Sequence, residues 1–268
     1  MKIVNSIWKV VASYRYMFVL CFCMLICSCT SVMKQPHGKP ALMWFDAEAN
    51  FGRFNQKDSI VFYLNKIKDL GFTHAVVDVR PITGEVLFDS QYAPRMEEWN
   101  GFKRGDFDYL GYFIEQGHKL GLEIHASLNV FCAGHNYFDR GMVYNGHSDW
   151  ASIVYNPDRG LSPITEEKEK YGAMINPLNE EYRIHIINVL KELVAKYPSL
   201  DGLMLDRVRY DGISADFSDL SRQAFESYIG KKVDNFPEDI LSWKKESGKR
   251  PVPQLGELSK VWFEWRSK

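Results

Sequence analysis

Short apolar runs alternate with segments of helical periodicity along most of the chain. We predict the apolar runs to be strands over residues 41–48, 73–80, 122–129 and 201–208. In the other segments, apolar residues recur three and four positions apart, which is typical of helices. These predicted helices cover residues 58–70, 108–120, 180–197 and 218–229. The alternation predicts a parallel sheet covered by helices, and both a doubly wound sheet and a (β/α)8 barrel fit it.

Polar side chains gather toward the C-terminal ends of the predicted strands, on one face of each strand. Side chains alternate between the two faces, so residues two positions apart share a face. The residues on this face are Trp44, Asp46, Asp78, Arg80, His125, Asn129 and Asp206. A sheet buried between two layers of helices would instead be almost continuously apolar. In a barrel, inward side chains at the C-terminal rim form the active site.

We therefore predict an α/β protein of the (β/α)8 TIM-barrel type, with these polar groups converging at one mouth. No Gly-x-Gly-x-x-Gly follows the first predicted strand and no Walker loop occurs, which disfavours a nucleotide-binding doubly wound domain. By residue 230 the chain has supplied four strand–helix units, whereas a closed barrel has eight. We expect residues 41–268 to be the N-terminal part of a barrel, with four to five units, in a truncated product or fragment.

The composition and charge of the chain limit the kinds of partner that we expect. The chain is 46% hydrophobic and 25% charged, as in ordinary globular proteins. Lys and Arg number 33, and Asp and Glu number 34. A nucleic-acid-binding domain usually has a basic excess, so we expect no nucleic-acid partner.

The first 28 residues have the pattern of a secretory signal. They contain three basic residues and no acidic ones, and their apolar run, Tyr16–Cys27, is short for a membrane span. The run leads into Ile26-Cys27-Ser28-Cys29, which resembles a bacterial lipobox. We expect a lipoprotein signal peptide over residues 1–28 and lipidation of Cys29. A plain signal peptide or a short anchor is the alternative.

A lipid on Cys29 would hold the protein at a membrane of the cell envelope, with residues 29–40 as a polar tether and residues 41–268 as the domain. Only one of the five cysteines, Cys132, lies beyond this region, so we expect neither a disulfide framework nor a thiolate metal cluster. His-x-His and HExxH spacings are absent from the sequence, and we expect no metal and no cofactor.

Five motifs follow one another between Ala41 and Ile229. They are Val77-Asp78-Val79-Arg80-Pro81, Gly84-Glu85, GHKLGLEIHA over residues 117–126, Asn176-Pro177 and DGLMLD over residues 201–206. In this order they resemble the motifs of the bacterial glycoside-hydrolase-like family 10. The resemblance implies a barrel glycosidase, often a lipoprotein. It also implies a polysaccharide substrate, such as peptidoglycan glycan strands or partially deacetylated poly-N-acetylglucosamine.

The resemblance implies roles for several residues by their position. Asp206 corresponds to the principal catalytic carboxylate. The groups that correspond to substrate-positioning residues are Arg80, Glu85, His125 and Asn129. Arg209 is similar in position to an arginine of a related group of barrels.

Three positions depart from the family pattern. Asp78 stands where the family usually has Gln, Ser127 where it has Trp, and Arg207 where it has a second Asp. These departures affect the expected substrate more than the expected fold.

Cleavage of a glycosidic bond needs a carboxylic acid that protonates the leaving oxygen and a carboxylate that acts as nucleophile or base. We expect Asp206 to be the carboxylate and Glu85 its partner, with Asp78, Glu48 or a group outside this chain as alternatives. The groups expected to contact substrate are Trp44, Asp46, Asp78, Arg80, His125, Asn129 and Arg209. Aromatic rings expected to stack on sugars are Tyr137, Tyr144, Trp150 and Tyr155.

Two other functions stay open on the sequence. One is a lipid-anchored glycan-binding protein without turnover, which the residues at positions 127 and 207 permit. The other, more remote, is a metal-dependent hydrolase in which His125, Asp78 and Asp206 bind the ion.

Overall fold

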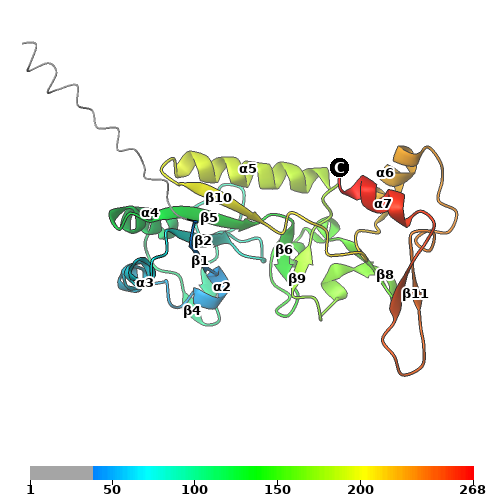
Figure 1. Cartoon of the computed structure of the whole chain (residues 1–268), viewed down its shortest axis with the longest axis horizontal. Helices are drawn as coiled ribbons and strands as arrows, with labels where there is room; N and C mark the ends of the chain where they lie inside the picture. Colours follow the sequence, from blue (N-terminus) through cyan, green and yellow to red (C-terminus); the bar gives the residue numbers. More distant parts are fainter. Residues whose placement is uncertain (1–38) are drawn as a thin grey trace, which may run out of the picture. The chain divides into compact units, whose positions relative to one another are not determined.

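Four parallel strands form the sheet on which the other elements are built (Figure 1). The computed structural model describes residues 39–268, and the predicted signal peptide, Cys29 and most of the tether lie outside these residues. The strands, hydrogen-bonded in this order, are β1 (Leu42–Phe45), β2 (His74–Arg80), β5 (Glu123–Asn129) and β10 (Gly202–Asp206). Each strand is added on the same side as the one before. This is barrel order, because a doubly wound sheet reverses direction at a switch point.

Three helices connect these strands and bury one face of the sheet. They are α3 (Lys57–Asp69), α4 (Tyr109–Lys119) and α5 (Glu180–Lys196). Leu64, Leu110 and Leu193 of the helices are fully buried in one core with Val77 and Ala126 of the sheet. Within residues 39–268, no helix has the length and apolar character needed to cross a bilayer.

The other face of the sheet carries the polar side chains of Asp78, Ser127, Asn129 and Asp206, in the alternation that the sequence predicts. Arg80 is the exception, because the register shifts between Asp78 and Arg80 and pairs Arg80 with Leu128. The pairing of β2 with β5 sets Asp78 opposite Ser127, and the pairing of β5 with β10 sets Asn129 opposite Asp206. The polar ends of these three strands therefore lie along one edge of the sheet.

Two strands end earlier than predicted. β1 ends at Phe45 because the Asp46 side chain accepts a hydrogen bond from the Ala49 N–H (2.7 Å) and caps the short helix α2 (Ala47–Asn50). Glu48 therefore lies on a helical turn. β10 ends at Asp206 because Arg207 has a φ of 52°, which is left-handed and incompatible with an extended strand.

The segment between β5 and α5 consists of hairpins and short turns. β6 (Cys132–His135) pairs with β9 (Gly172–Met174), and β7 (Ile153–Asn156) pairs with β8 (Gly160–Pro163). Three 3-10 turns span Met142–Tyr144, Ser148–Trp150 and Ile164–Glu166. A further small hairpin, of β3 (Glu98–Trp99) and β4 (Phe102–Lys103), precedes α4.

After β10 the chain builds a second hydrophobic cluster instead of adding a fifth strand to the sheet. Its elements are α6 (Asp219–Ile229), β11 (Leu241–Lys244), β12 (Val252–Leu255) and α7 (Ser259–Arg266) (Figure 1). Trp262 is fully buried there and stacks on Phe217, with 5.3 Å between the ring centroids.

The two outer strands of the sheet expose apolar side chains. Leu42 and Trp44 of β1 and Leu205 of β10 are each more than a third exposed. In a closed barrel such edges are paired with further strands. The fold is thus α/β with a parallel sheet of barrel type, as predicted, and the described residues contribute four strands to it.

The packing of α5 gives a test of this arrangement. Leu193→Ala is expected to lower the free energy of unfolding by about 2–5 kcal/mol, because it leaves a cavity in the core. Val194→Ala changes the next residue, which is half exposed, and is expected to change stability by less than about 0.5 kcal/mol. Urea unfolding followed by circular dichroism measures both. Similar losses in the two variants would contradict the packing of this helix against the sheet.

Candidate active site

Arg80, at the end of β2, ties the ends of two strands together. Its guanidinium is fully buried and donates to the backbone carbonyls of Asn129 and Cys132 (3.0 Å for the latter) and to the Tyr182 hydroxyl (3.3 Å). In return, Nδ2 of Asn129 donates to the carbonyl of Arg80 (3.0 Å). The guanidinium therefore has protein rather than open space around it, and in this structure it positions Asn129.

Arg207 extends this network to the end of β10. Its Nε donates to Oδ1 of Asn129 (2.9 Å), and its backbone N–H donates to Oδ1 of Asp206 (2.7 Å). Its guanidinium lies 5.8 Å from the ring centroid of Tyr171, which directly precedes β9. The left-handed backbone at Arg207 turns the side chain back over the sheet, so the position that departs from the family pattern is part of the site.

Three carboxyl groups lie together where β1 and β2 end. Asp78 is only 4% exposed and accepts hydrogen bonds from the N–H groups of Ala47 (3.4 Å) and Arg80 (3.3 Å). Burial raises the pKa of Asp78 to about 8, and the negative charges of Asp46 and Glu48 contribute to this rise. At neutral pH Asp78 therefore keeps its proton.

Glu48 is the second acid with a displaced pKa. Its side chain is 7% exposed, its Oε2 accepts a hydrogen bond from the Tyr171 hydroxyl (2.6 Å), and its Oε1 is buried without a hydrogen-bond partner. Burial raises the pKa of Glu48 to about 7, although the Tyr171 hydrogen bond and the charge of Arg207 oppose this rise. A carboxyl group with such a pKa can donate a proton near neutral pH.

Aromatic rings surround His135, whose Nε2 lies 3.9 Å from Oε2 of Glu48. The rings of Trp99, Tyr137, Phe138 and Tyr171 have centroids 4.5–5.6 Å from that of His135. Tyr137 and Phe138 are more than half exposed, so they form an open aromatic surface beside Glu48.

The other predicted stacking residues have different surroundings. Trp150 is buried and stacked on His147 at 3.8 Å. The hydroxyl of Tyr144 donates to Asn136, and that of Tyr155 donates to Glu238. Among the four aromatic residues singled out in the sequence, Tyr137 is the one that has its ring exposed beside the candidate site.

Glu85 forms a bidentate ion pair with Arg140. Its carboxylate oxygens accept hydrogen bonds from Nε (2.9 Å) and Nη2 (3.0 Å) of Arg140, which also pairs with Glu98 (2.7 Å). Both oxygens of this carboxylate are therefore engaged by the same guanidinium.

Three predicted site residues lie away from the rim. His125 and Trp44 share a lower row of the sheet, because both flank Val76 in the register. His125 precedes Asn129 by four residues, about 13 Å along the strand, and it is not brought together with Asp78 and Asp206. Arg209 is exposed and lines a surface pocket formed with α6 and α7.

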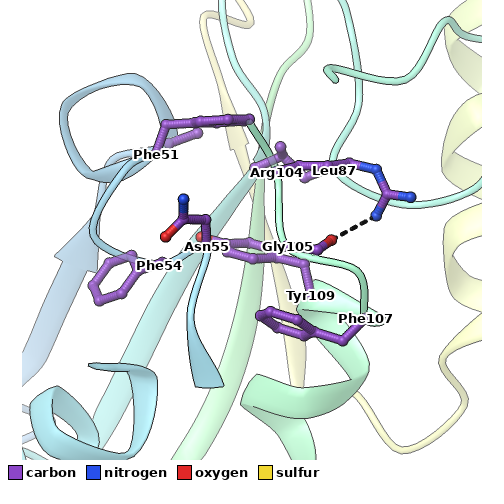
Figure 2. Close-up of a pocket in the computed structure, with 9 residues that line it drawn as sticks. Phe51, Phe54, Asn55, Leu87, Arg104, Gly105, Phe107 and Tyr109 are labelled. Carbon is purple, nitrogen blue, oxygen red and sulfur yellow. Dashed lines mark hydrogen bonds between the residues drawn. The ribbon is translucent and has the colours of Figure 1, made fainter. Parts of the chain in front are cut away.

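A small cavity of about 20 Å³ lies beside α2 (Figure 2). Arg104 lines this cavity and donates a hydrogen bond to the carbonyl of Gly105 (2.8 Å). The apolar part of the cavity lining includes Phe51, Phe54, Phe107 and Tyr109. This volume has room for about one water molecule and none for a sugar.

Comparison with solved structures places the fold among barrel glycosidases. Alpha-L-fucosidase isoenzyme 2 from Paenibacillus thiaminolyticus superposes with a TM-score of 0.52 and 17% identity, over 73% of this chain and 27% of that chain. The chain belongs to the glycosyl hydrolase-like 10 family, whose model matches residues 43–268. The resemblance found in the sequence motifs is thereby confirmed.

Two curated relatives agree with this membership. An S-layer-related protein of Niallia circulans is 34% identical over 244 residues, which are 86% of this chain and 15% of that protein. The glycosyl hydrolase YngK of Bacillus subtilis (strain 168) is 25% identical over 213 residues, 77% of this chain and 38% of that protein. The chain thus spans less than two fifths of either relative. Family membership thus makes this a glycosyl hydrolase-like chain.

The buried acids make stability depend on pH. An unfolded aspartate loses its proton near pH 4, whereas folded Asp78 keeps its proton up to about pH 8. Between these values the folded state binds more protons, so the free energy of unfolding falls as pH rises, by up to about 1.4 kcal/mol per pH unit. Asp78→Asn is expected to flatten this dependence and to be more stable than the wild type at pH 8.

Urea unfolding at pH 5, 6, 7 and 8 measures this dependence. Asp219→Asn, which changes an exposed carboxylate in the first turn of α6, is the control and is expected to keep the wild-type slope. An unchanged slope in Asp78→Asn would show that Asp78 does not hold its proton in the folded state.

Proposed function

We propose that this protein is a glycoside hydrolase that cleaves a bacterial envelope or exopolysaccharide glycan with two carboxyl groups. The observation that carries the proposal is the contrast between Glu48 and Asp206. Glu48 is enclosed and its pKa is raised to about 7, whereas Asp206 is exposed at the end of the neighbouring network. Two carboxyl groups in different environments are what glycosidic cleavage requires.

In this mechanism Glu48 is the general acid. Its proton goes to the leaving glycosidic oxygen while the bond from that oxygen to the anomeric carbon breaks. Asp206 acts at the anomeric carbon, either as the nucleophile or as the base that activates water. Solvent and the Arg207 N–H stabilise the negative charge of Asp206.

Glu85, the partner of Asp206 expected from the sequence, is the alternative acid. Both oxygens of Glu85 are engaged in the ion pair with Arg140, whereas the pKa of Glu48 is raised, which is the reason for preferring Glu48. The exposed rings of Tyr137 and Phe138 beside Glu48 are suited to stack on a sugar face.

An amino-sugar polymer such as peptidoglycan glycan strands is the proposed substrate class. The family resemblance supports it, as do the lipobox-like sequence at Cys29 and the relative named as S-layer-related. With lipidation at Cys29, the domain would act on glycans of the cell envelope from a membrane surface.

Release of reducing ends from a panel of glycans tests the activity. The panel contains peptidoglycan glycan strands, partially deacetylated poly-N-acetylglucosamine and a fucosylated oligosaccharide. Asp206→Asn and Glu48→Gln are each expected to lower kcat/KM by about 10²–10⁴-fold, and Asp219→Asn is expected to leave it unchanged. A larger loss in Glu85→Gln than in Glu48→Gln would transfer the acid role to Glu85. Tight binding without release would instead favour a non-catalytic glycan-binding protein.

Tyr171→Phe tests the role of Glu48 as the acid. The variant removes the hydrogen bond that lowers the pKa of Glu48, so that pKa is expected to rise. Activity requires protonated Glu48, and the alkaline limb of the kcat/KM profile is therefore expected to move to higher pH. Tyr137→Phe is the matched control, because the Tyr137 hydroxyl has no role in the proposed proton transfer. An alkaline limb that does not move in Tyr171→Phe would remove Glu48 from the mechanism.

A further inference from the structure

Two histidines and a glutamate meet at the N-terminal ends of β2 and β5, at the opposite end of the strands from the carboxyl groups of the site. His74 opens β2 and is paired in register with Glu123, which opens β5. His125 shares the face of Glu123 because it is two residues further along the same strand. Among the described residues, this group alone brings three metal-ligating side chains within 4.8 Å of one another.

The ligand atoms converge on one point. Nε2 of His74 lies 3.2 Å from Oε2 of Glu123, and Nε2 of His125 lies 3.9 Å from the same oxygen. Zinc binds imidazole nitrogen and carboxylate oxygen at about 2.0–2.2 Å, so tetrahedral ligands are about 3.4 Å apart. The observed separations lie on either side of this value, and small side-chain movements would seat an ion between the three atoms.

Neighbouring residues orient both imidazoles. Oγ1 of Thr73 lies 2.6 Å from Nδ1 of His74 and occupies that nitrogen, which leaves Nε2 directed at Glu123. A hydrogen bond to the second ring nitrogen is the usual companion of a metal-binding histidine. On β10, Gly202 leaves space for His125, since a Cβ there would lie 2.9 Å from the imidazole.

We propose that His74, Glu123 and His125 bind a divalent transition-metal ion, and that Zn²⁺ is the ion best matched to two imidazoles and one carboxylate. The ion would join the starts of β2 and β5 and leave a fourth position for water or another ligand. The N-terminal face of a barrel serves stability rather than catalysis. We therefore expect the ion to affect stability, and its binding does not depend on the proposed glycosidase activity.

Zinc binding to the chelator-treated full chain tests the proposal. Isothermal titration with zinc chloride is expected to give one site that is lost, or weakened at least about tenfold, in His125→Gln and His74→Gln. The melting temperature of the wild type is expected to rise with zinc and to fall again with EDTA. Circular dichroism confirms that each variant is folded.

His118→Gln is the matched control. His118 is also paired with a carboxylate, Asp201 (2.7 Å), but it lies on α4 outside the group. The His118→Gln variant is expected to bind zinc as the wild type does. Four further cysteines lie outside the described residues. The comparison with His125→Gln distinguishes zinc bound by those cysteines from zinc bound by the histidine–glutamate group.

Two results would overturn the proposal. One is equal zinc affinity in the wild type and in both histidine variants. The other is a wild-type melting temperature that responds to neither zinc nor EDTA, which would leave the group as a histidine–glutamate ion pair.

Discussion

The buried guanidinium of Arg80 is the interaction on which the candidate site depends. A charge without access to water is costly unless hydrogen bonds replace the lost hydration. Here two backbone carbonyls and the Tyr182 hydroxyl provide those bonds. Because these partners lie at the end of β5, at the start of β6 and on α5, one side chain fixes the end of β2 against all three elements. The side chain of Asn129 accepts a hydrogen bond from Arg207, and this bond holds the end of β10 in the same network.

The carboxyl groups beside this network work against stability. Glu48 and Asp78 are enclosed to a degree that raises their pKa values to about 7 and about 8. A core made only for stability would contain apolar side chains at these positions. Acids that are expensive to ionise are typical of places where a protein transfers protons. In the proposed mechanism two tasks are thus separate, since Arg80 supports the site and the acids would provide its chemistry.

Much of the sheet was predictable because alternation along a strand is a local property. It correctly placed Asp78, Asn129 and Asp206 on one face at one edge. It failed at β1, where the tendency of Asp46 to cap a helix prevailed over the apolar run. It could not show that Arg80 is enclosed, because burial depends on what packs above a residue.

The contacts that complete the site could not be predicted from the sequence, for a different reason. Tyr171 and Glu48 are 123 positions apart, and His135 and Tyr171 lie in a segment without clear periodicity. The position of Arg207 in the site follows from a backbone turn that no pattern indicated. The histidine–glutamate group had one available signal, Glu123-Ile124-His125, where the period of two puts both ligands on one face.

The left-handed turn at Arg207 also affects how sequences of this family can diverge. Aspartate is among the non-glycine residues that adopt this backbone conformation most readily, so the main chain would accept the aspartate that the family usually has there. That exchange would replace a cation with an anion beside Glu48, whose proton would then be held more tightly. The residue at this one position would thus tune the acidity of Glu48 through its charge.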